Sequence, residues 1–222
     1  MPTKFYNFVL IFNLNIRKGE EVEVKVKALI FDMDGTLLAL PVNYSLLKIR
    51  LSKELGRHVT SIFGTLVGLL REGNIEMYRR VLSILDEEEL RAVENVRIFP
   101  DTIGVLRHFD RKGAKLALVT LQGRKVVRRI LSMSQLGEFF GEENVVTREY
   151  SIFREVQLQR VLEMLEVEPS EAVFVGDREN DARAGREIGC RVFIIRRSES
   201  REEEVSAPVI RSLEELKTLV SV

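Results

Sequence analysis

The sequence predicts an α/β fold, in which a parallel sheet is flanked by helices and a small all-helical block follows the first strand. Two observations lead to this prediction. Short apolar runs alternate with amphipathic stretches along most of the chain, which is the pattern of repeated strand–helix–strand units. Residues 41–96 break that alternation, because they contain no strand pattern.

The predicted core strands are near-continuous apolar runs, as expected for strands buried on both faces of a parallel sheet. They are residues 27–34 (KALIFDMD), 115–120 (KLALVT), 144–147 (NVVT), 172–177 (AVFVGD) and 191–195 (RVFII). Helices fill the intervals. We expect Asp101 to cap one of them, residues 152–166 to form another, and Ser212 with Glu215 to open the last through a capping box. The core then comprises residues 27–40 and 97–222.

Residues 41–96 are predicted to form three or four short helices, and hence a second, smaller domain. Polar residues can begin three of them: Asn43 or Ser45, then Thr60 or Ser61, and finally Asp86, which forms a capping box with Glu89. The remaining helix carries Ile75, Tyr78, Leu82 and Leu85. The hinges of this domain are expected near residues 40–42 and 96–100.

Residues 1–26 form an N-terminal extension with two strand-like segments, residues 4–12 and 21–27. Lys18 and Gly19 can turn between them, which predicts a β-hairpin at the sheet edge. An incorrectly chosen start codon is the alternative. We expect no catalytic role for this segment.

The composition favours a protein of the cytoplasm that binds neither nucleic acid nor membranes. The 222 residues include 34 basic and 34 acidic side chains, without the basic excess of nucleic-acid-binding proteins. The arginine pairs at 128–129 and 196–197 are expected at solvated helix or strand ends. The single cysteine, Cys190, allows no internal disulfide, which fits a reducing compartment. No apolar run reaches the length of a bilayer span, and asparagines interrupt the apolar N-terminal stretch.

The strongest chemical signal is the segment LIFDMDGTLL at residues 29–38. Asp32 and Asp34 are two residues apart, so they point the same way from a strand. Gly35 then lets the chain turn at the carboxyl edge of the sheet, where ligands bind in open α/β folds. Carboxylates held side by side repel each other, and a bound cation relieves that repulsion.

This segment resembles the first motif of the haloacid dehalogenase superfamily, and specifically of its phosphatases, in which D-x-D-x-T follows a buried strand. Asp32, Asp34 and Thr36 match that motif, and Thr120 matches the second motif, a Ser or Thr that ends the next strand. Asp177 and Asp181 match the acidic pair of the fourth motif. The resemblance covers about residues 27–220 and implies a Rossmann-like core with a helical cap inserted after the first motif.

The resemblance also implies an activity and a role for each matching residue. Asp32 would be the nucleophile that becomes phosphorylated, and Asp34 the general acid and base. Mg²⁺ would be held by Asp32, the backbone carbonyl of Asp34 and Asp177, with Asp181 in support. Phosphate oxygens would accept hydrogen bonds from Thr120 and from backbone amides near Gly35 and Leu121. The expected substrate is a small phosphorylated metabolite, as in the phosphoglycolate phosphatase-like branch.

One element of the family pattern is absent. The third motif is a lysine about two dozen residues before the fourth, and no lysine lies between Lys125 and Lys217. Counting back from the fourth motif reaches Ile152, so the nearest cation is Arg154, with Arg148 as a second candidate. Arginine also binds phosphate, although its shape differs from that of lysine. Arg124 and Lys125, at a predicted helix start, are further sources of positive charge.

Two other functions remain open from the sequence, and a third is disfavoured. Asp34 argues against dehalogenation, because a halide leaves without needing a proton. A phosphomutase similar to β-phosphoglucomutase would share the two aspartates and would depend on a sugar bisphosphate. A catalytically weak member that binds a phosphorylated ligand or a protein is favoured by the absent lysine. Several cap arginines are candidate substrate contacts, and the sequence does not choose among Arg50, Arg57, Arg71 and Arg79.

Overall fold

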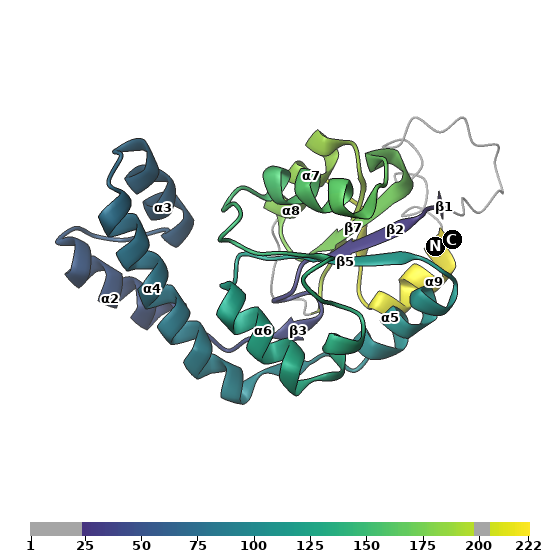
Figure 1. Cartoon of the computed structure of the whole chain (residues 1–222), viewed down its shortest axis with the longest axis horizontal. Helices are drawn as coiled ribbons and strands as arrows, with labels where there is room; N and C mark the ends of the chain where they lie inside the picture. Colours follow the sequence, from purple (N-terminus) through teal and green to yellow (C-terminus); the bar gives the residue numbers. More distant parts are fainter. Residues whose placement is uncertain (1–23, 198–204) are drawn as a thin grey trace, which may run out of the picture.

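The centre of the molecule is a six-stranded sheet in which every strand pair is parallel (Figure 1). The computed structural model describes residues 24–197 and 205–222. The strand order is β6-β5-β2-β7-β8-β9. The strands are β2 (Ala28–Phe31), β5 (Lys115–Val119), β6 (Val145–Val146), β7 (Ala172–Gly176), β8 (Arg191–Ile195) and β9 (Val209–Ile210). The predicted α/β fold is confirmed, and the sequence missed only the short edge strand β9 of this sheet.

Helices cover both faces of the sheet, so its strands are shielded from water on both sides (Figure 1). One face packs against α7 (Arg154–Leu165) and α8 (Glu179–Ile188). The other face packs against α5 (Thr102–Arg111), α6 (Arg124–Met133) and α9 (Leu216–Leu219). This two-sided burial explains why the strand sequences are almost continuously apolar.

The register of the central strands aligns the chemical motifs at one edge. Phe31, the last residue of β2, lies opposite Leu118 of β5 and Val175 of β7. Because all three strands run in the same direction, their carboxyl ends reach the same level of the sheet. Asp32, Thr120 and Asp177 follow these ends and therefore emerge beside one another.

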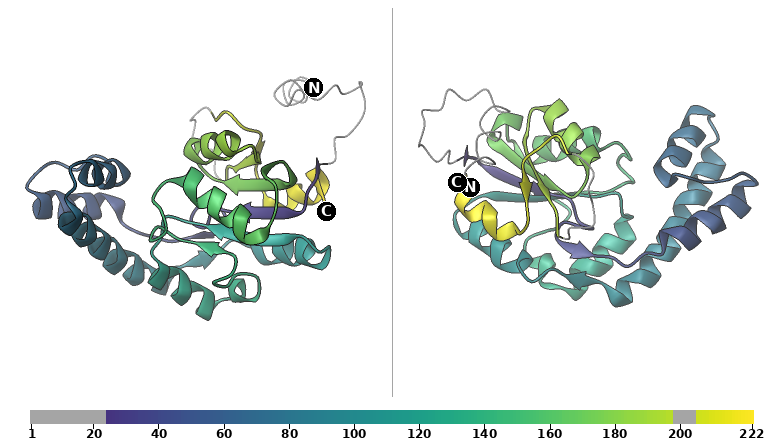
Figure 2. Two further views of the ribbon diagram at one scale, coloured as in Figure 1. Left: turned by 45° about the horizontal axis from the view of Figure 1, so that its top comes forward. Right: turned by 180° about the vertical axis from the view of Figure 1, so that it is seen from behind.

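A block of three helices projects from the carboxyl edge of the sheet (Figures 1 and 2). The helices are α2 (Tyr44–Leu55), α3 (Ile62–Arg71) and α4 (Ile75–Ala92), and they enclose an apolar cluster of their own. Asn43 and Ser61 cap α2 and α3 as predicted. Where the chain leaves the core and returns to it, β3 (Leu38–Ala39) and β4 (Arg97–Ile98) pair antiparallel.

The predicted helix start at Asp86 and Glu89 is wrong. Both residues lie inside α4, which continues unbroken to Ala92. The buried side chains Val81, Leu85 and Ala92 continue one apolar face along the helix, and no residue there interrupts it. Asp86 and Glu89 instead direct their carboxylates toward Arg148.

The predicted capping role of Asp101 is also wrong. Its side chain makes no capping bond to α5. The carboxylate instead accepts hydrogen bonds from the Ser212 hydroxyl and the Leu213 amide, both at 2.8 Å, and pairs with Arg197 at 3.0 Å. Arg196 is buried and Arg197 lies over the ring of Phe99, so this pair is not a solvated strand end as expected.

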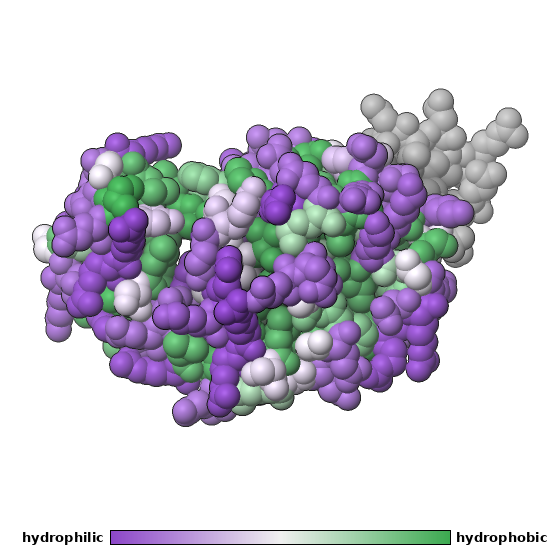
Figure 3. Space-filling view, in the orientation of Figure 1, coloured by the Kyte–Doolittle hydropathy of each residue, from purple (hydrophilic) through white to green (hydrophobic). Residues whose placement is uncertain are grey.

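Near the ends of the described chain, β1 (Val24–Lys25) pairs in parallel with β10 (Val220–Ser221). The first strand of the predicted N-terminal hairpin lies outside the described residues. No helix in residues 24–197 or 205–222 has both the length and the apolar character of a membrane span. The face seen in Figure 3 is mainly hydrophilic, with small apolar patches over both the core and the helical block.

Candidate active site

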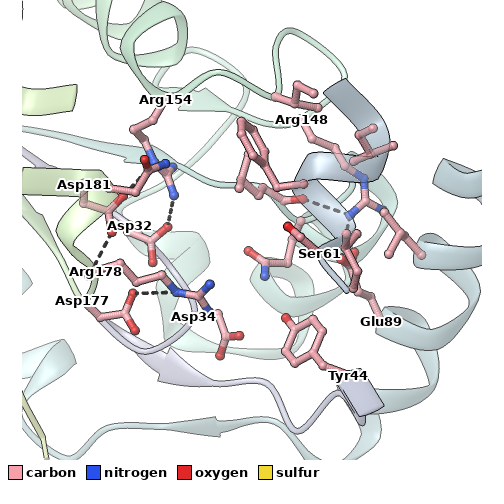
Figure 4. A pocket seen from close by; sticks show the side chains of 18 of the residues that line it. Asp32, Asp34, Tyr44, Ser61, Glu89, Arg148, Arg154, Asp177, Arg178 and Asp181 are labelled. Carbon is pink, nitrogen blue, oxygen red and sulfur yellow. Dashed lines mark hydrogen bonds and ion pairs between the residues drawn. The ribbon is translucent and has the colours of Figure 1, made fainter. Parts of the chain in front are cut away.

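Four aspartates gather at the carboxyl edge of the sheet (Figure 4). Asp32 and Asp34 follow β2, Asp177 follows β7, and Asp181 lies in the first turn of α8. Asp32, Asp177 and Asp181 are buried. All four line one cavity of about 570 Å³ between the sheet edge and the helical block. The spacing of the motifs along the chain therefore leads to a single site.

Arg154 enters this site from the first residue of α7. Its guanidinium donates from Nη2 to Asp32 Oδ1 at 2.6 Å and lies with Nε 2.9 Å from Asp181 Oδ1. Nη1 donates to Gln157 Oε1 at 2.9 Å, and Arg154 is only 7% exposed. The guanidinium thus joins two buried carboxylates and lies against the predicted nucleophile.

The ionised aspartates of the site carry more negative charge than Arg154 alone offsets. Burial raises the pKa of the Asp32 carboxyl well above its usual value, the Arg154 charge lowers it, and the charges of Asp181, Asp177 and Asp34 raise it further. Burial likewise raises the pKa of Asp34, and so does the Asp177 charge, against the hydrogen bond from the Leu40 amide and the Arg178 charge, which lower it. These shifts indicate that Arg154 alone does not balance the carboxylates.

The donor set fits a divalent cation. When ionised, the four aspartates carry four negative charges against the guanidiniums of Arg154 and Arg178, which leaves two in excess. In residues 24–197 and 205–222 no three acidic, histidine or cysteine side chains already form a metal cluster. Mg²⁺ does not need one, because it is usually bound through one or two carboxylates and retains several waters.

Gly35 allows Asp177 to approach the first motif closely. A Cβ atom at position 35 would lie 2.5 Å from Asp177 Oδ2, and the residue has a φ of +89°, which favours glycine. The Gly35 amide donates to the Leu38 carbonyl at 2.8 Å, within the turn. Its predicted contact with phosphate stays a prediction.

Thr120 is fully buried at the end of β5, next to the cavity wall formed by Leu121 and Gln122. Its hydroxyl is hydrogen-bonded to the Gln122 side chain, and its carbonyl accepts from Gln157 Nε2 at 2.8 Å. The Leu121 carbonyl accepts from Arg148 Nη1 at 2.9 Å. These contacts fix the loop after β5 beside the carboxylates.

Arg148, the second candidate cation, lines the same cavity but is paired with carboxylates of α4 and not with the four aspartates. It lies 2.6 Å from Glu89 Oε1 and also pairs with Asp86, both on α4. Arg148 and Glu89 are buried. Of the other candidates, Arg124 lines a separate groove at the sheet edge together with Tyr150.

Further residues, which the sequence did not assign to the site, also line the cavity. Tyr44 and Lys48 of α2 and Phe63 of α3 line the cavity, as does Arg178 directly after Asp177. The cap arginines considered earlier have other partners: Arg50 pairs with Glu87 and Glu88, and Arg57 pairs with Glu72. The position of Arg178 beside a motif aspartate was the one signal available in the sequence.

A family model described as haloacid dehalogenase-like hydrolase matches residues 26–189, which is most of the chain. This chain belongs to the haloacid dehalogenase-like hydrolase family. The four aspartates that match the first and fourth motifs lie within the matched residues, and so does Arg154.

The chain is similar in sequence to curated bacterial proteins, including a pyrophosphatase and a phosphoglycolate phosphatase. The chain is 29% identical over 103 residues to pyrophosphatase PpaX of Bacillus cereus, covering 46% of this chain and 48% of that protein. It is 29% identical over 98 residues to phosphoglycolate phosphatase 1 of Pseudomonas aeruginosa, covering 42% of this chain and 35% of that protein. The chain therefore spans half the length, or less, of the curated relatives it matches.

The fold superposes on a solved structure over most of both chains. The crystal structure of a phosphatase of this family from Thermococcus onnurineus superposes with a TM-score of 0.61 at 26% identity. The match covers 86% of this chain and 96% of that one. Both the sheet and the helical block thus have a counterpart in a known member of the family.

Proposed function

We propose that this chain is a magnesium-dependent phosphatase that hydrolyses a small phosphorylated metabolite through a phosphorylated Asp32. The observation that carries the proposal is the buried pair between the Arg154 guanidinium and Asp32 at the floor of the cavity. Membership of a hydrolase family whose matching proteins are named as phosphatases supports the same reaction class.

The reaction divides into two transfers at phosphorus. In the first, a carboxylate oxygen of Asp32 attacks phosphorus, the bond to the leaving oxygen breaks, and Asp34 gives that oxygen a proton. In the second, Asp34 takes a proton from water, the water oxygen attacks phosphorus, and the bond to Asp32 breaks. Inorganic phosphate leaves and both aspartates return to their starting state.

The other site residues supply positive charge, donate hydrogen bonds to phosphate, or hold the metal ion. Arg154 offers positive charge beside Asp32, in the role that the absent lysine has in the family. Thr120 and the Leu121 amide are the proposed donors to phosphate oxygens. Asp32, the Asp34 carbonyl and Asp177 would hold Mg²⁺, with Asp181 in support, and the bound ion supplies positive charge that offsets repulsion between the carboxylates and phosphate.

The cavity size favours a small substrate. Its volume of about 570 Å³ is within the usual range for small-molecule sites. Lys48 and Arg178 add positive charge to its wall, while Phe63 and Leu66 make part of that wall apolar. We therefore expect a small organic phosphate, held with its phosphate at Asp32 and its organic part against the helical block.

The test is phosphate release from p-nitrophenyl phosphate and from a panel of metabolites, with Mg²⁺ and with EDTA. Asp32→Asn should lower kcat by roughly four orders of magnitude or more, because the nucleophile is lost. Asp110→Asn is the matched control, since Asp110 is exposed on α5. Absence of turnover in folded, Mg²⁺-bound wild-type protein would instead support a protein that binds phosphorylated ligands without hydrolysing them.

A further inference from the structure

Arg148 lies where the helical block meets the loop after β5. It belongs to the loop after β6, and its side chain is only 3% exposed although it lines the cavity. One guanidinium nitrogen, Nη1, donates to Glu89 Oε1 of α4 at 2.6 Å and to the Leu121 carbonyl at 2.9 Å. Nη2 donates to Asp86, also on α4. A single buried side chain therefore joins the helical block to the loop that carries Leu121.

A second bond and a close approach connect the same loop to α4. The Gly123 amide donates to Glu89 Oε2 at 3.2 Å. A Cβ atom at position 123 would overlap the Asp86 carboxylate and lie 2.8 Å from Arg148 Nη2, so a larger residue could not lie here without displacing α4. Figure 4 shows Arg148 and Glu89 together, across the cavity from Arg154. The helical block thus contacts the loop from its own side of the cavity.

The loop after β5 is held from two sides. On the core side, Gln157 Nε2 donates to the Thr120 carbonyl at 2.8 Å, which fixes the peptide group that carries the Leu121 amide. On the side of the helical block, Arg148 holds the next peptide group by the Leu121 carbonyl, and the Gln122 amide of that group donates to the Thr120 hydroxyl at 3.3 Å. Two planar peptide groups that share a Cα atom restrain each other through two torsions. The direction of the Leu121 amide therefore depends on Arg148 as well as on Gln157.

We propose that Arg148 is a positioning residue that keeps the Leu121 amide aimed at a phosphate oxygen and that couples this alignment to the position of the helical block. The inference rests on the proposed function, in which the Leu121 amide donates to phosphate. Alignment matters because a hydrogen bond weakens steeply as its angle departs from linear. Asp86 and Glu89 hold the guanidinium in place, so a displacement of α4 would release the loop and lower the affinity for phosphate.

The consequence is a loss that falls on binding more than on turnover. A donor to phosphate oxygens interacts with the phosphate both before and during the reaction, so its misalignment weakens both states alike. Such a change raises KM and leaves kcat nearly unaltered. A side chain that only stabilised the fold would instead lower the amount of active enzyme, and hence the apparent kcat, at an unchanged KM.

The experiment separates the bond to Leu121 from the charge balance with Glu89. Arg148→Met and the double variant Arg148→Met with Glu89→Gln both lack the bond to the Leu121 carbonyl. In the double variant the buried Glu89 charge is also gone, and an acceptor for the Gly123 amide remains. Binding of inorganic phosphate in Mg²⁺ is measured by isothermal titration calorimetry, at a temperature at which circular dichroism shows each variant folded.

We expect the Kd for phosphate to rise about tenfold in both variants, which is the effect of losing one hydrogen bond to a charged group. The KM for p-nitrophenyl phosphate should rise by a similar factor, with kcat within about threefold of the wild-type value. Arg91→Met is the matched control, because Arg91 is an exposed arginine that pairs with Glu88 of α4. It should leave Kd, KM and kcat unchanged.

Two results would overturn the inference. If the double variant recovered the wild-type affinity for phosphate, Arg148 would serve only to balance the charge of Glu89. If the wild-type protein bound no phosphate, there would be no phosphate site for Arg148 to arrange. Failure of the proposed hydrolysis is distinguishable, since turnover would then be absent or insensitive to Asp32→Asn while the tenfold difference in phosphate affinity would still be measured.

Discussion

The Arg154 guanidinium lies against Asp32, and we propose that it stands in for the lysine that the family resemblance leads us to expect. A lysine ammonium is a compact charge on a flexible stem, whereas the guanidinium is a planar fork that can bond two groups at once. Arg154 uses this shape, since separate nitrogens reach Asp32 and Asp181. In this proposed role Arg154 would supply the same charge and would also link the first and fourth motifs through its contacts with Asp32 and Asp181.

The first prediction at the residue scale concerns that link. Arg154→Ala should lower kcat/KM for p-nitrophenyl phosphate about 100-fold, because a charge aimed at the reacting group is lost. Arg154→Lys should recover part of this loss, since a single ammonium can balance Asp32 without also joining Asp181. Steady-state kinetics in saturating Mg²⁺ measure both variants.

The control for this prediction is Arg160→Ala, which removes an exposed arginine of the same helix. It should leave kcat/KM unchanged. If Arg154→Ala kept wild-type kinetics, the guanidinium would have a purely structural role and Arg178 would become the candidate cation.

Individual site residues differ in how far the sequence could specify them. Asp32 and Asp177 follow buried strands, so their meeting at the sheet edge follows from parallel topology alone. Arg154 was proposed because it is the cation nearest to the expected lysine position, found by counting back from the fourth motif. Tyr44 and Lys48 were not predicted, because their contact with the cavity depends on how α2 lies over the sheet, and no local pattern encodes that position.

Helix α4 shows at the scale of elements why a local pattern can mislead. Asp86 and Glu89 have the spacing of a capping box, but they also lie on one face of a helix, three residues apart. Their partner, Arg148, comes about sixty residues later in the chain and pairs with both. The local sequence therefore predicts only the capping box, whereas in the folded protein Asp86 and Glu89 bind Arg148 and join α4 to the loop after β6.

This cluster should stabilise the contact between the helical block and the core. Arg148→Met leaves Glu89 buried without its cation, so we expect the free energy of unfolding to fall by about 3 kcal/mol. Adding Glu89→Gln removes the stranded charge and keeps an acceptor for the Gly123 amide, which donates to Glu89 at 3.2 Å. The double variant should therefore be more stable than Arg148→Met alone, as measured by urea denaturation.

Arg91→Met is the matched control on the same helix, because Arg91 pairs with Glu88 at the surface. Its cost should stay below about 1 kcal/mol. Equal stability of Arg148→Met and the double variant would mean that Glu89 is not the group that Arg148 compensates.

At the scale of the whole molecule, hydrophobic patterning predicted five strands of the central sheet and a helical segment after the first of them, but not the spatial order of the strands. Apolar runs predict the buried strands, and the absence of a strand pattern in residues 41–96 predicts where a helical segment separates the first strand from the next. Val209–Ile210 was missed, because this two-residue strand lies between Pro208 and Arg211 and no longer apolar run marks it. The pairing of Asp101 with Arg197 was likewise inaccessible, because it joins segments almost a hundred residues apart.

The balance of charge between the sheet edge and bound Mg²⁺ should make the stability of the whole protein depend on pH. The pKa values of Asp32 and Asp34 are raised in the folded state, so the metal-free folded protein holds more protons than the unfolded chain. The contribution of these two carboxyl groups to stability is therefore fully present below their unfolded pKa values and is lost as the pH rises through the raised folded values. Bound Mg²⁺ favours the ionised carboxylates and opposes that loss.

We accordingly expect Mg²⁺ to raise the melting temperature more at pH 8 than at pH 5. At a concentration of 100 times Kd the ion adds about 2.7 kcal/mol, or about 5 to 10 °C for a chain of this size. At pH 5 protons compete for the same carboxylates, so the gain over EDTA should be less than half as large. Asp32→Asn should reduce the gain at pH 8 while Asp110→Asn retains it, and an equal gain at both pH values would show that the ion binds away from these carboxylates.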